Sequence, residues 1–232
     1  MSLSKAYLFR ESLNQGLAEK VAALDRLHYP DSLIEIMEAV LLDQTCPRGL
    51  PLLAAAVECS GVDAGERPQA AEVIWQGLLL TALLAVEKRP ADGLAAGLAY
   101  RFDNAHLLLA ADTLLTWPFE FLAREANGPR AVAALSSGAR GALSALAAIE
   151  GKFSALLEWN PLEALLAAGC PDKELSSVAG LPGLLRASYL ADLERWLGSP
   201  SWLTGAVVKT RSSLDGETLA PRLDEVRALL MA

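Results

Sequence analysis

Residues 73–86 read VIWQGLLLTALLAV and form the most apolar run of the chain. The run is shorter than the ~20 residues that a helix needs to cross a bilayer. Its commonest residue, Leu, loses little conformational entropy in a helix, and Ala behaves in the same way. The run therefore predicts a buried core helix, which we extend over residues 69–88.

The composition of the whole chain favours helices. The chain has 232 residues, of which 53% are hydrophobic, so it can bury a large core as one domain or as two small ones. Ala and Leu dominate, strand-forming residues are sparse, and the sequence shows no alternating strand pattern. We therefore expect an all-α fold, a single-domain helical bundle over residues 1–232.

Amphipathic patterns on both sides of the run predict further helices. In residues 5–27 the apolar positions recur at three- and four-residue spacing, and they are Leu13, Leu17, Val21 and Leu24. A second helix opens at Pro30, and its buried stripe is Leu33, Met37, Val40 and Leu41. Residues 89–93 predict a break. The other predicted helices span residues 51–59, 104–125, 129–159, 161–168, 172–197 and 219–231.

Charge and cysteine content limit the classes of partner. The formal net charge is −8, and the Lys and Arg residues are scattered rather than clustered. Such a surface attracts phosphate backbones poorly, so we expect no nucleic acid partner. The three cysteines, Cys46, Cys59 and Cys170, have no metal-ligand spacing and suit free thiols in a reducing compartment. With no visible secretory signal and no membrane span, we expect a cytoplasmic protein.

One segment resembles a motif of a known enzyme family. Residues 102–115 read FDNAHLLLAADTLL, and PFEFLA follows at residues 118–123. This segment is similar to the pattern F-G-x-x-x-A-I-L-x-G-D-x-L-L of the trans-polyprenyl diphosphate synthases. Residues 29–63, 150–155 and 180–187 resemble other family motifs in the same order along the chain. The resemblance covers roughly residues 29–190 and implies the isoprenoid synthase fold, truncated at the C-terminus.

The resemblance also locates a metal motif that this chain lacks. The family's D-D-x-x-D falls on residues 83–87, which read LLAVE, so Leu83 and Leu84 replace two aspartates and Glu87 takes the last position. In active members these aspartates bind magnesium, which prefers hard oxygen ligands and neutralises the departing diphosphate. Leucine offers no ligand. We therefore expect neither a metal nor another cofactor here, and no prenyl transfer.

The family's basic diphosphate-binding turn survives only in part. Alignment on Pro51 places Arg48 on the first arginine of that turn. Pro47 and Leu50 replace its lysine and its second arginine. In the family these groups hold the diphosphate of isopentenyl diphosphate, and a single arginine cannot replace the cluster. The resemblance thus leaves Arg48 as a residual anion-binding candidate.

Apolar residues of the central helices are candidates for lining a cavity. They are Trp75, Leu79, Leu80 and Leu108. Large aromatic side chains usually pack in cores or interfaces, so a cavity is one of two interpretations. Neither His28 nor His106 has a set of Cys, Asp or Glu residues at helical ligand spacing around it, and we assign no catalytic residue. Asp112 lies in an apolar helix, where a buried charge would need a partner.

Three functions are compatible with these patterns. The first hypothesis is a catalytically inactive polyprenyl diphosphate synthase homologue, a regulatory or structural subunit in isoprenoid biosynthesis. Because synthases of the family are typically dimers, such a chain would form a homodimer or a heterodimer with an active synthase. The first alternative is a non-enzymatic protein that binds an isoprenoid or another lipid. The second is a divergent active prenyltransferase with Glu87, Asp92 and Asp103 as metal ligands.

Overall fold

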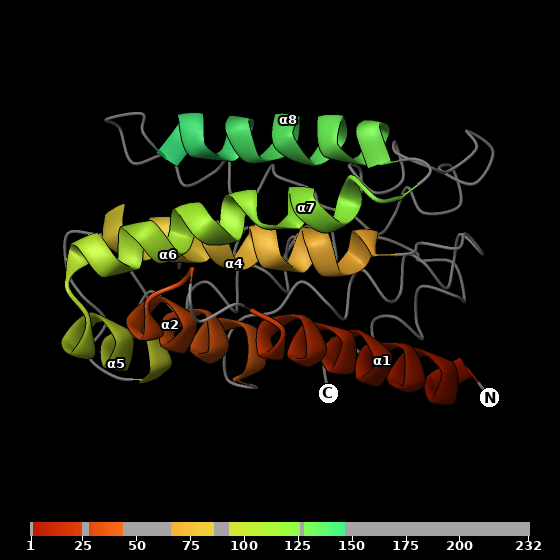
Figure 1. The fold of residues 1–232 in the computed structure, drawn as a ribbon, viewed down its shortest axis with the longest axis horizontal. Helices are drawn as coiled ribbons and strands as arrows, with labels where there is room; N and C mark the ends of the chain where they lie inside the picture. Colours follow the sequence, from red (N-terminus) through yellow and green to blue (C-terminus); the bar gives the residue numbers. More distant parts are fainter. Residues whose placement is uncertain (1, 25–27, 44–65, 86–92, 126–127, 147–232) are drawn as a thin grey trace, which may run out of the picture.

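The computed structural model describes residues 2–24, 28–43, 66–85, 93–125 and 128–146. Its regular elements in this part are all α-helices, which confirms the all-α prediction. They are α1 (Ser2–Ala22), α2 (Asp31–Leu42), α4 (Arg67–Ala85), α5 (Gly93–Arg101), α6 (Asn104–Thr116), α7 (Pro118–Leu122) and α8 (Gly128–Leu146). Figure 1 shows three layers, with α4, α6 and α7 between α8 on one side and α1, α2 and α5 on the other.

The helix α4 lies in the middle of this arrangement. It packs against α6 and α7, which run back along it in the opposite direction, and also against α8, α1 and α2 (Figure 1). Every residue from 70 to 80 is buried, so α4 has no solvent-facing stripe over these three turns. The prediction of a buried core helix from the run at residues 73–86 is confirmed, and its observed bounds are Arg67–Ala85.

The two N-terminal helices bury much of the apolar stripes that their spacing predicts. In α1, Leu17 and Val21 are buried, whereas Leu24 follows the end of the helix and is partly exposed. In α2, the predicted residues Leu33, Met37, Val40 and Leu41 are all buried, together with Ile34 and Ile36. The helices α1 and α2 pack against each other, and both contact α4. They therefore close one side of the core.

A proline divides the helix that the sequence predicts over residues 104–125. The structure has α6 up to Thr116 and the short α7 from Pro118, with Trp117 between them. Pro118 has no N–H to donate, and its ring crowds the preceding helical turn, so the regular hydrogen-bond ladder stops there. The chain keeps its direction, because Trp117 still donates its backbone N–H to the Thr113 oxygen at 2.8 Å.

The helix α5 is absent from the sequence-based prediction, which placed only a break at residues 89–93. Gly93 opens α5 with a φ of +75°, a left-handed conformation that glycine adopts without steric cost. Two glycines in nine residues lower the intrinsic helix propensity of this segment. Burial of Ala95, Leu98 and Ala99, which share one helical face, compensates for that low propensity.

Two polar residues of α4 are buried among its apolar residues. Glu72 and Gln76 are both fully buried, and Gln76 Nε2 donates a hydrogen bond of 2.8 Å to Glu72 Oε1. The two residues lie four positions apart and therefore share one face of the helix. The hydrogen bond offsets part of the cost of removing both groups from water.

Close packing between α4 and α6 depends on Gly77. A Cβ atom at this position would lie 3.0 Å from Leu115 Cγ, 3.1 Å from the Ala111 carbonyl oxygen and 3.2 Å from Leu114 Cβ. Because one of these neighbours is backbone, a larger side chain would push the two helices apart. Glycine here allows α6 to approach the central helix closely.

We expect Gly77→Leu to lower the free energy of unfolding by about 1–3 kcal/mol, because the added atoms overpack the contact between α4 and α6. The matched control is Gly97→Ala in α5, where an added Cβ has no neighbour within 4 Å. There the substitution is expected to raise stability by roughly 0.5–1 kcal/mol, the usual gain of Ala over Gly in a helix. Urea denaturation followed by circular dichroism measures both, and a Gly77→Leu protein as stable as the parent would contradict the packing argument.

Other sequence-based predictions fall outside the described residues. These are the helices predicted at residues 51–59, 161–168, 172–197 and 219–231, and the part of the 129–159 helix beyond Leu146. The partition into a single domain stays a prediction. In the part of the chain that the structure describes, no helix combines the length and apolar character needed to cross a bilayer.

Candidate functional site

The last turn of α4 contains Leu83 and Leu84, the positions that align with the two aspartates of the family's metal motif. Leu83 is 4% exposed and packs in the core, whereas Leu84 is partly exposed. Within the described ranges, no group of three or more His, Cys, Asp or Glu side chains lies close enough together to hold a metal ion. Arg48, Glu87 and Asp92 fall outside those ranges, so their predicted roles stay predictions.

The four cavity-lining candidates occupy two different environments. Trp75, Leu79 and Leu80 are fully buried in α4. Leu108 lies on α6 and is 48% exposed. None of the four lines the cleft described below. Their role around a cavity stays a prediction.

Asp103, a candidate metal ligand of the divergent-enzyme alternative, caps the N-terminus of α6. Its side chain accepts hydrogen bonds from the His106 backbone N–H at 2.9 Å and shares a 2.8 Å contact with His106 Nδ1. The backbone hydrogen bond, followed by the contact with the imidazole, lowers the pKa of this exposed carboxyl. The cap satisfies a backbone donor that the first helical turn leaves without an intrahelical partner.

We expect Asp103→Ala to lower the melting temperature, because α6 loses its cap. The native pKa of Asp103 is lowered, so the charged cap contributes stability above the unfolded-state pKa of about 4 and loses it as the pH falls through the native pKa. The difference in Tm between the parent and the variant should therefore shrink as the pH falls below about 4. Asp103→Asn, which keeps a capping acceptor without the charge, is the control and should be affected less at pH 7. A difference that grows at low pH would contradict this assignment.

The outward face of α6 exposes apolar residues. Leu108 and Leu109 are 48% and 55% exposed, and Ala105 and Asp112 lie beside them at helical spacing. We call Ala105, Leu108, Leu109 and Asp112 the outer stripe of α6. The expectation of a buried charge at Asp112 is wrong, because the opposite face of α6, with Leu107, Ala110, Ala111 and Leu114, is the one that packs inward.

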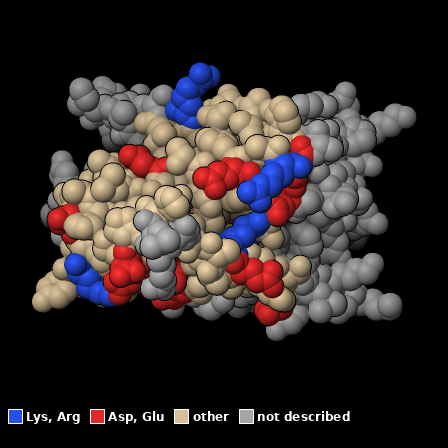
Figure 2. Space-filling view, in the orientation of Figure 1, with Lys and Arg blue, Asp and Glu red and all other residues tan. Residues whose placement is uncertain are grey.

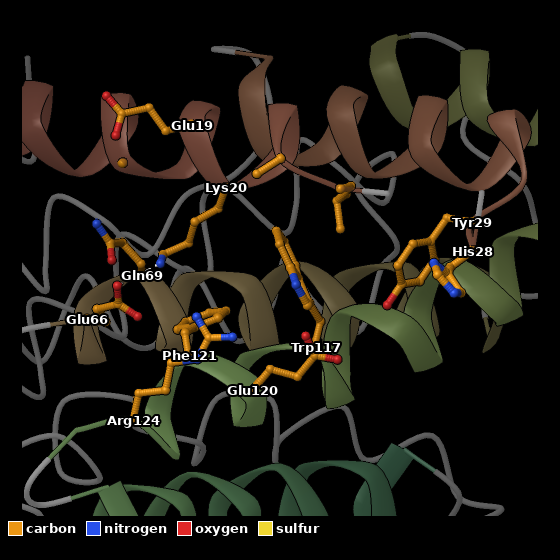
Figure 3. A pocket seen from close by; sticks show the side chains of 13 residues that line it. Glu19, Lys20, His28, Tyr29, Glu66, Gln69, Trp117, Glu120, Phe121 and Arg124 are labelled. Atoms are coloured by element: carbon orange, nitrogen blue, oxygen red, sulfur yellow. Dashed lines mark hydrogen bonds and ion pairs between the residues drawn. The ribbon is translucent and has the colours of Figure 1, made fainter. Parts of the chain in front are cut away.

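A cleft of about 880 Å³ lies at the α1 and α7 end of the bundle (Figure 3). Its walls are the C-terminal part of α1, residues 28–29, the start of α4 and the α7 region, and we call it the α1–α7 cleft. Aromatic side chains from two of these segments contribute to it, namely Tyr29, Trp117 and Phe121. The rings of Trp117 and Phe121 meet edge to face, with centroids 5.8 Å apart.

Lys20 joins the walls of the α1–α7 cleft. Figure 3 shows its side chain extending from α1 toward the start of α4. Its Nζ lies 2.8 Å from Glu66 Oε1 and 4.5 Å from the centroid of the Phe121 ring. The Glu66 backbone N–H in turn donates to Glu125 Oε1, so a carboxylate that follows α7 binds the N-terminus of α4. These contacts tie α1, α4 and α7 together.

Charged side chains of both signs surround this cleft. Figure 2 shows acidic and basic groups gathered over the α1 and α7 side of the near face. The lining includes Glu19, Glu66 and Glu120 against Lys20 and Arg124. Sequence reasoning missed the cleft, because its residues are scattered between positions 16 and 124 and no local motif links them. The charged and aromatic side chains of the cleft lining can bind a ligand, but the lining residues do not include a nucleophile paired with a base.

No protein-family model matches the chain, and no curated protein matches it. The resemblance to the polyprenyl synthases therefore rests on the order and spacing of the motifs in the sequence itself. The structure adds that Leu83, where that alignment places the missing metal motif, and residues 104–115, which resemble the quoted pattern, belong to helices that pack against each other. The family assignment and the activity it implies remain matters of proposal.

Proposed function

We propose that the chain is a catalytically inactive homologue of the trans-polyprenyl diphosphate synthases that serves as a regulatory or structural subunit beside an active synthase or a second copy of itself. The observation that carries this proposal is the burial of Leu83. Leu83 aligns with the first metal-binding aspartate of the family, and its apolar side chain is only 4% exposed in the packed bundle. The position supplies packing energy in place of a magnesium ligand.

The direction of α4 supports the same interpretation. Leu83 and Leu84 lie in its last turn, where the helix dipole places partial negative charge. Paired carboxylates at such an end repel both the dipole and each other, and they are stable there only with a cation. Leucines at these positions remove the need for the metal, so the helical framework persists without it.

The outer stripe of α6 supports the subunit role. Two adjacent leucines that are about half exposed cost solvation free energy unless another surface covers them. The sequence of α6 also resembles the family motif. Because synthases of this family are typically dimers, each chain needs a surface that contacts the second subunit. We assign the outer stripe, with Leu108 and Leu109 at its centre, as the contact with the partner subunit.

Leu83→Asp tests whether the former metal position is packed core. We expect the free energy of unfolding to fall by about 2–5 kcal/mol or more. Removal of a buried leucine side chain alone costs an amount in this range, and the unpaired carboxylate adds to that cost. Millimolar magnesium should not restore the lost stability. Leu84→Asp is the matched control and should cost less, since Leu84 is partly exposed. Thermal unfolding with and without magnesium measures these effects, and rescue of Leu83→Asp by magnesium would indicate an open metal site.

The subunit role predicts a partner that depends on the outer stripe of α6. We expect the chain to co-purify with an active polyprenyl synthase from the same cell, or to dimerise with itself, and to change the product lengths of the active enzyme. Leu108→Glu combined with Leu109→Glu should weaken the association about tenfold or more, because two charges would be buried in the contact. Analytical ultracentrifugation and product chromatography provide the measurements.

The control for that experiment is Tyr100→Glu in α5, an exposed apolar residue outside the outer stripe. It should leave the association unchanged. The chain alone, given isopentenyl and allylic diphosphates with magnesium, should form no elongated product. Robust elongation by the chain alone would favour the divergent-enzyme alternative, and a monomer that ignores every such synthase would contradict the subunit role.

A further inference from the structure

We draw no further inference here: the strongest candidate, the α1–α7 cleft, has its environment for a cation, between Glu66 and the Phe121 ring, already filled by Lys20, and no second observation among the described residues points to a ligand for the exposed carboxylates of its lining.

Discussion

The burial of α4 on all sides is the constraint on which the described structure depends. Its residues 70–80 have no contact with solvent, so each side chain must fit a neighbour on another helix. Gly77 leaves room for α6 to pack closely, and the hydrogen bond between Gln76 and Glu72 provides one partner for the polar groups enclosed in this packing. The contact at Gly77 depends on shape, and the contact between Gln76 and Glu72 depends on hydrogen bonding. Burial of apolar side chains supplies most of the free energy that stabilises the fold.

The two ends of α4 differ in chemistry, and the helix dipole explains the difference. At the N-terminus, Glu125 accepts from the Glu66 backbone N–H, and carboxylates there are stabilised by the positive end of the dipole. At the C-terminus the chain has Leu83 and Leu84, where carboxylates would face the negative end. A magnesium site at that end requires the metal to offset this repulsion, whereas leucines need no ion. The leucines at this end of α4 are therefore compatible with a stable core that holds no ion.

The two faces of α6 differ in their surroundings. Leu107, Ala110, Ala111 and Leu114 face the core, and the small alanines permit close contact with α4. The outer stripe shares the same helix, so a partner bound there would contact the element that packs directly on the central helix.

The sequence by itself determined the all-α class, the core helix around residues 73–86 and the buried stripe of α2, because these features depend on local propensity and on spacing within one helix. It did not predict α5, since tertiary burial of Ala95, Leu98 and Ala99 outweighs the low propensity of its glycines. Nor did it assign Asp112 to the surface, because an apolar segment does not reveal which of its faces finds a neighbour. The α1–α7 cleft was also decided by tertiary structure alone. Lys20 and Glu66 are separated by 46 positions, and only the packing of α1 against α4 brings their charges together.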